Sequence, residues 1–108
     1  MPIEKWSDRV SVVHLADDPQ FTDDMSALEG DPSVASRDVV LDFAAVHFIN
    51  SSNIARLLKL RQTMRSRQRR LVLCGISTQV WGVFLVTGLD KIFDFSDNVT
   101  TGLATLQM

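Results

Sequence analysis

The sequence is poor in the residues that build disulfides and phosphate-binding loops, and it lacks the long apolar runs that build membrane spans. Its 108 residues include one cysteine, five glycines, three prolines and no tyrosine. The single cysteine, Cys74, cannot form an internal disulfide, which suits a reducing compartment. No apolar run reaches the roughly 18–20 residues needed to cross a bilayer, and the N-terminus lacks the basic-then-apolar pattern of a secretory signal. We therefore expect a cytoplasmic protein that does not insert into a membrane.

Motifs that carry catalysis are also missing. The few glycines form no phosphate-cradling loop and no dinucleotide fingerprint, and the chain has no Gly-x-Ser-x-Gly elbow. His14 and His47 have no cysteine or histidine neighbour at metal-ligand spacing. The aspartates between residues 17 and 24 do not match a calcium loop, so we expect a solvated acidic loop there. These absences predict a non-enzymatic protein with no metal and no cofactor.

Charge is distributed unevenly along the chain. Residues 1–55 hold ten acidic and three basic side chains, whereas residues 56–108 hold eight basic and three acidic ones. Seven of the eleven basic residues lie between Arg56 and Arg70. A solvated basic helix face is the first interpretation, and docking to an acidic partner is the second. Because no aromatic residue is interleaved among these bases, we expect no nucleic-acid binding.

The apolar pattern predicts strands that alternate with helices. β-Branched and apolar runs indicate strands at 9–15, 39–43, 70–74 and 92–95, with a short strand at 3–6. Helical spacing or capping residues indicate helices at 21–28, after 50–53, from 77 to 88, and at 97–106. The sequence therefore predicts one α/β domain over residues 1–108, with a mainly parallel sheet, an antiparallel N-terminal strand and about four covering helices.

Two helices have distinct expected faces. The helix that Ser77 caps has apolar residues at helical spacing, and we expect them in the core: Val80, Trp81, Phe84 and Leu85. In the preceding helix, Ile54, Leu57, Leu58 and Met64 form an apolar stripe beside the basic face. Its start, Asn50-Ser51-Ser52-Asn53, contains residues that are preferred as helix caps.

The segment from Val39 to Asn53 reads VVLDFAAVHFINSSN, and residues 71–93 read LVLCGISTQVWGVFLVTGLDKIF. Together they resemble the STAS domain of the anti-sigma-factor antagonist type. That family shows an apolar strand ending in aspartate, then Phe-(Ile/Met)-Asp-Ser-Ser-Gly at the start of a helix. The resemblance extends over about residues 38–106. It implies a STAS-like fold.

The resemblance also implies a partner switch. A family member binds a serine kinase that doubles as an anti-sigma factor, and the kinase releases the antagonist after phosphorylating it. The second serine of the family's pair matches Ser52, which is the implied phosphoacceptor. The implied partner-binding residues are Asp18, Gln20, Asn50, Ser51, Ser52, Asn53 and Arg56.

Two positions depart from the family pattern, and they leave alternatives open. The family's aspartate is Asn50 here, and its glycine is Asn53. Ser51 and Ser52 could therefore serve only as helix-capping residues in a protein that binds its partner constitutively. A second hypothesis is a cytoplasmic accessory subunit of an ABC-type transporter, with its ATPase as partner. Nucleotide sensing is the third and ranks last, because the chain has no phosphate-binding loop.

Overall fold

The computed structural model describes residues 3–34 and 36–107. Its strands are β1 (Ile3–Lys5), β2 (Val10–Ala16), β3 (Asp38–Ala45), β4 (Leu71–Cys74) and β5 (Asp94–Ser96). Its α-helices are α1 (Gln20–Gly30), α2 (Ser51–Ser66), α3 (Thr78–Thr87) and α4 (Val99–Leu106), and short 3₁₀ turns occupy Pro32–Val34 and Leu89–Lys91. None of the helices in these ranges is long and apolar enough to cross a membrane.

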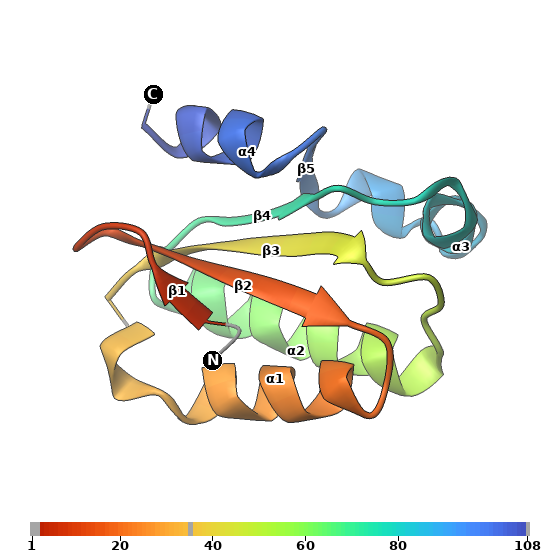
Figure 1. The fold of residues 1–108 in the computed structure, drawn as a ribbon, viewed down its shortest axis with the longest axis horizontal. Coiled ribbons are helices and arrows are strands. Elements are labelled where there is room, and N and C mark those ends of the chain that lie inside the picture. Colours follow the sequence, from red (N-terminus) through yellow and green to blue (C-terminus); the bar gives the residue numbers. More distant parts are fainter. Residues whose placement is uncertain (1–2, 35, 108) are drawn as a thin grey trace.

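The strands form one mixed sheet in the order β1-β2-β3-β4-β5. β1 pairs antiparallel with β2, and every other pairing is parallel. Helices α1 and α2 cover one face, α4 covers the other, and α3 lies near the end at which β3 terminates (Figure 1). The expected α/β class, the parallel sheet, the antiparallel first strand and the four helices are thus confirmed.

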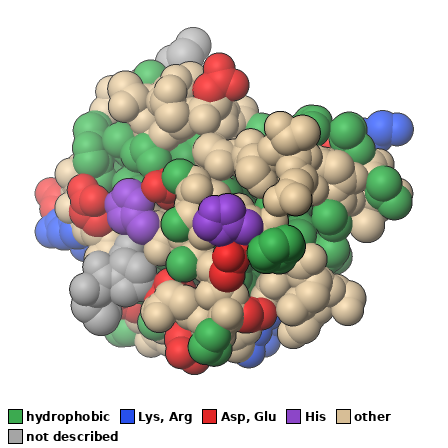
Figure 2. Space-filling model, turned by 45° about the vertical axis from the view of Figure 1, so that its right-hand side comes forward, with side chains coloured by type: hydrophobic (Ala, Val, Ile, Leu, Met, Phe, Trp, Pro, Cys, Tyr) green, Lys and Arg blue, Asp and Glu red, His purple; other side chains and the backbone are tan. Residues whose placement is uncertain are grey.

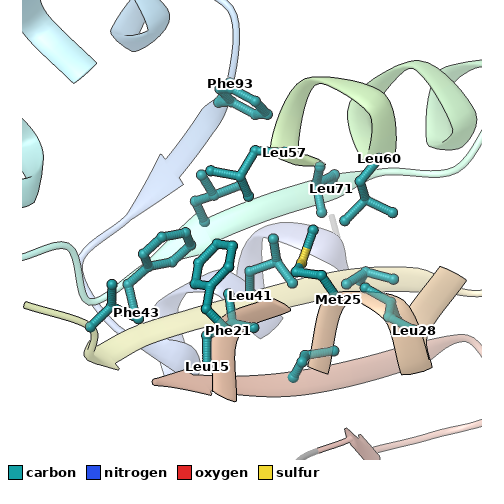
Figure 3. Close-up of a cluster of buried hydrophobic side chains, with 14 of the residues drawn as sticks. Leu15, Phe21, Met25, Leu28, Leu41, Phe43, Leu57, Leu60, Leu71 and Phe93 are labelled. Carbon is teal, nitrogen blue, oxygen red and sulfur yellow. The ribbon is translucent and has the colours of Figure 1, made fainter. Parts of the chain in front are cut away.

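Alternation along the strands divides the apolar side chains between two cores. Val39, Leu41 and Phe43 face the larger core, which α1, α2 and α3 complete, whereas Val40 faces the smaller core under α4. This is the period-two pattern of a strand that is buried on both faces. Side chains from α1, α2 and three strands meet in the larger core (Figure 3).

Aromatic rings join the helices to the sheet within the larger core. Phe43 contacts Phe21 of α1 edge-on at 6.1 Å between ring centroids and Phe84 of α3 at 6.3 Å. Edge-to-face pairs of this kind add to the stabilisation that burial provides. They fix the start of α1 and the whole of α3 relative to the end of β3, so the loops around that end rest on a rigid base.

Several details differ from the sequence expectations. Leu85 is 52% exposed and Trp81 is only partly buried at the edge of the core, whereas Phe84 is fully buried as expected. Leu58 is also exposed, at 38%. The last strand begins at Asp94 instead of Ile92, because Ile92 ends the 3₁₀ turn at Leu89–Lys91 with helical backbone angles. Asp24 is only 3% exposed, so it does not belong to a solvated acidic loop.

Candidate functional site

The candidate site lies where two parallel strands end. β2 and β3 are neighbours in the same direction, so the loop after β2 (residues 17–19) and the loop after β3 (residues 46–50) leave the same edge of the sheet (Figure 1). The first loop leads into α1 and the second into α2. This topology brings together residues that are about 30 positions apart in the sequence.

The N-terminus of α2 is held by a reciprocal pair of asparagines. The Asn50 side-chain oxygen accepts a hydrogen bond from the backbone N–H of Asn53 at 2.8 Å. The Asn53 side-chain oxygen accepts one from the backbone N–H of Asn50 at 3.1 Å. This is a capping box in which asparagine takes both positions, so two N–H groups that the helix leaves unpaired are satisfied.

Asp18 fastens this helix start to the preceding loop. Its carboxylate accepts hydrogen bonds from Asn53 Nδ2 at 2.9 Å and from Asn50 Nδ2 at 3.4 Å. It also accepts from the backbone N–H of Thr22 at 2.9 Å and from the Thr22 hydroxyl at 2.7 Å. These donors, the Asn53 amide first, lower the pKa of Asp18 below its usual value. The carboxylate is therefore ionised near neutral pH and bridges α1 to α2.

Ser51 and Ser52 are the first two residues of α2, and both are exposed. Neither side chain makes a hydrogen bond to any residue within 3–34 and 36–107. They therefore do not cap the helix, because Asn50 has that role. Both hydroxyls are free to meet a partner or a modifying enzyme. Asp18, Asn50, Ser51, Ser52 and Asn53 are together called the cap site below.

Gln20 and Arg56 form their hydrogen bonds with residues of α1 and not with the two serines. The Gln20 amide donates to Asp24 Oδ1 at 2.8 Å. The Arg56 guanidinium donates to Ser26 Oγ at 3.2 Å and lies 3.7 Å from a Glu29 oxygen. Gln20 thus stabilises α1 itself, and Arg56 joins α2 to α1.

Ser52 and Arg56 nevertheless share one surface. Both line a shallow groove of about 360 Å³ that also involves Ser26 and Glu29 of α1. Because Arg56 comes four positions after Ser52 on the helix, the two side chains project from the same side of α2.

Asp17 forms a second clamp that sequence reasoning missed. Its Oδ1 accepts hydrogen bonds from the backbone N–H of His47 at 2.7 Å and from that of Phe48 at 3.2 Å. Its Oδ2 is 2.9 Å from His47 Nδ1. The backbone N–H of His47 contributes most to lowering the pKa of Asp17. This clamp fixes the loop before α2, from which the Phe48 side chain projects with 70% exposure.

The other histidine lies on the open part of the sheet. His14 Nδ1 is 2.8 Å from Asp42 Oδ2, and His14 Nε2 is 3.2 Å from Glu4 Oε1. Both histidines appear among acidic side chains on the face shown in Figure 2. In the parts of the chain that the structure describes, no group of His, Cys, Asp or Glu could hold a metal ion. Cys74 is buried, and burial raises the pKa of its thiol to about 12.

Comparison with solved structures finds the same fold in several other chains. A variant of RsbS from Moorella thermoacetica is 24% identical, with a TM-score of 0.78 and coverage of 99% of this chain and 96% of that one. A chain of the stressosome, which is described as a signal integration and transduction hub, is 25% identical, with a TM-score of 0.75 and coverage of 98% of this chain and 96% of that one. The Bacillus cell-fate determinant SpoIIAA in its phosphorylated form is 16% identical, with a TM-score of 0.67 and coverage of 87% and 88%.

No curated protein matches the chain. A family model, described as the STAS domain, matches residues 3–102. This match includes the sheet, α1, α2 and α3, and therefore the whole cap site. The chain belongs to the STAS domain family and has the fold of its anti-sigma-factor antagonists.

Proposed function

We propose that this protein is a non-enzymatic regulator that binds a serine kinase acting also as an anti-sigma factor, and that phosphorylation of Ser52 releases it. The observation that carries the proposal is the exposed Ser52 hydroxyl in the first turn of α2. Around it, Asp18, Asn50 and Asn53 lock the backbone of that turn. A kinase would therefore meet an accessible serine on a preorganised surface.

A phosphate on Ser52 would change the surface without unfolding the helix. Phosphoserine carries about −1.5 to −2 charges at neutral pH, and a helix N-terminus with its free N–H groups tolerates such a charge. Arg56 is the nearby cation across the shared groove, and the phosphate would compete with Glu29 for it. The change in charge and bulk would be confined to the partner-facing turn. The phosphate would therefore release the partner by local repulsion and steric hindrance, without unfolding the domain.

The two departures from the family pattern are compatible with this proposal. Asn50 retains the capping function of the aspartate it replaces, with a 2.8 Å bond to the Asn53 N–H. The missing negative charge has a substitute nearby, because the Asp18 carboxylate lies 3.4 Å from Asn50 Nδ2. Asn53 uses its side chain to bind that same carboxylate at 2.9 Å. The cap site thus keeps an anion beside the serine pair.

Two solved forms of SpoIIAA, which has this fold, support regulation by phosphorylation. The solved SpoIIAA chains are described as a phosphorylated cell-fate determinant and as an unphosphorylated anti-sigma factor antagonist. Each is 16% identical to this chain, so the likeness itself concerns the fold. This likeness supports the proposal because the same fold is found in a phosphorylated and in an unphosphorylated form.

Affinity capture from the native cells tests the proposal. The baits are the wild type, Ser52→Asp and the matched control Thr100→Asp, which places the same charge at the exposed second residue of α4, outside the cap site. We expect the wild type and the control to capture a serine kinase of the anti-sigma type, with at least about tenfold less bound to Ser52→Asp. Recovery of one transporter ATPase by all three baits would instead support the accessory-subunit hypothesis. Equal capture of a kinase by all three would refute the role of Ser52.

A further inference from the structure

The two ends of the molecule carry opposite charge. β2, β3 and β4 are parallel, so the segments that follow them gather at one end of the 34 Å long axis and the segments that precede them gather at the other (Figure 1). The acidic end (residues 16–24, 42–55, 74–81 and 96–98) contains six aspartates and no lysine or arginine. The basic end (residues 6–10, 29–34, 36–38, 64–71 and 104–107) contains six arginines, three aspartates and one glutamate, and therefore keeps a net positive charge.

The acidic end presents a fixed apolar side chain. The Phe48 side chain is 70% exposed. Its backbone N–H donates a hydrogen bond to Asp17 Oδ1 at 3.2 Å, and the backbone N–H of His47 donates to the same oxygen at 2.7 Å. Leaving an aromatic ring in water is unfavourable, and burying it in a partner would recover that free energy. Because the loop is already held in place, little conformational entropy would be lost on docking.

The basic end presents a cleft that fits such a side chain. The cleft has a volume of about 730 Å³ and lies between the β1–β2 turn and the end of α4. Trp6, Val10 and Leu106 contribute apolar surface. Arg9 and Arg69 contribute positive charge, and Asp38 contributes one negative charge. Trp6 is itself 43% exposed. An aromatic residue beside a carboxylate, as Phe48 is beside Asp17, is complementary to this combination.

We propose that the acidic end of one molecule docks on the basic end of a second copy, with Phe48 entering the cleft beside Trp6. The charge complementarity of the two ends identifies the second copy as the occupant, since one chain carries both halves of the contact. The contact is heterologous, and it therefore propagates into chains or closes into a ring. It does not depend on phosphorylation, and it covers the same end of the molecule as the cap site.

Sedimentation velocity of the purified protein tests this contact. We expect wild-type protein to form concentration-dependent oligomers at about 0.01 M salt and to dissociate at about 1 M, since the screening length falls from about 30 Å to about 3 Å. Phe48→Ala and the double variant Arg9→Glu/Arg69→Glu should each associate at least about tenfold more weakly. Leu58→Ala removes an exposed apolar side chain outside both ends and should associate like the wild type.

Mixing the two defective variants identifies the geometry. Phe48→Ala retains an intact basic end, and Arg9→Glu/Arg69→Glu retains an intact acidic end. An equimolar mixture should therefore form a dimer that grows no further. A monomeric wild type at low salt, unchanged association of either variant, or a mixture that stays monomeric would overturn the proposal. Circular dichroism of each variant verifies that it is folded, and the result is independent of any kinase.

Discussion

Replacing Asn53 with alanine should destabilise the protein by about 2 kcal/mol, although the residue lies in a surface turn. Asn53 is only 2% exposed, and its amide makes two hydrogen bonds, from the Asn50 N–H at 3.1 Å and to Asp18 at 2.9 Å. Alanine would remove both bonds. The Asn50 N–H and the Asp18 carboxylate would then have to find water in a partly covered position.

The magnitude follows from the two lost bonds. A hydrogen bond between neutral groups contributes about 0.5–1.5 kcal/mol, and one to a charged group about 1.5–3 kcal/mol. Asp18 is exposed, so solvent screening favours the lower end of the second range. The better helix propensity of alanine returns about 0.5 kcal/mol. The net loss of about 2 kcal/mol corresponds to a decrease of about 8 °C in the melting temperature for a domain of this size.

Urea unfolding measures this loss. Trp81 is a suitable fluorescent probe, because it packs edge-on against Phe95 at 4.9 Å. Ser51→Ala is the matched control and should stay within about 0.5 kcal/mol of the wild type. A double-mutant cycle of Asn53→Ala with Asp18→Asn should give a coupling of about 1 kcal/mol. If Asn53→Ala unfolds at the same urea concentration as the control, the cap site is not the rigid element described above.

Three further changes have defined outcomes. The pKa of His14 is raised, chiefly because its ring forms a hydrogen bond with Asp42 at 2.8 Å. The protonated ring therefore stabilises the folded protein fully below pH 6.5, and this stabilisation is lost as the pH rises through the folded-state pKa. The free energy of unfolding should fall across that pH range, and His14→Gln should make the fall smaller. Gly102→Ala should raise the melting temperature, because alanine has a better helix propensity than glycine by about 1 kcal/mol. The added methyl group would lie 3.5 Å from methyl groups of Val40 and Val72, which is ordinary van der Waals contact. A lower melting temperature would contradict the packing of α4. Cys74, whose pKa is raised to about 12, should resist thiol reagents until the protein unfolds, and rapid labelling of native protein would contradict its burial.

The regular elements were predictable because each has a local signal. The apolar run at 39–43 is long enough for a strand that is buried on both faces, and it forms β3. The helix expected to end at residue 88 does so, because Gly88 adopts a left-handed φ of 75° that glycine permits. The exposure of Leu85 was not predictable in this way, because helical spacing cannot tell how far a sheet extends beneath a helix.

The clamps of the candidate site were beyond sequence reasoning for a related reason. Asp17 and His47 are 30 residues apart, and each alone has the features of a solvated loop residue. Their contact depends on the register of β2 against β3, which aligns the ends of the two strands. The available signal was topological, since loops after adjacent parallel strands leave the same edge of a sheet. The prediction that Asp24 lies in a solvated loop was wrong, because its burial depends on how α1 packs against the rest of the domain.

Phosphopeptide mapping of the protein isolated from its native cells tests the central claim most directly. Trypsin should release residues 38–56 as one peptide, bounded by Arg37 and Arg56, that contains both serines of the cap site. Fragmentation spectra distinguish the two adjacent positions. A regulated partner switch predicts phosphate on Ser52 and none on Ser51, in an amount that changes with growth conditions. An unmodified peptide in every condition would contradict the account and leave the cap site as a constitutive binding surface.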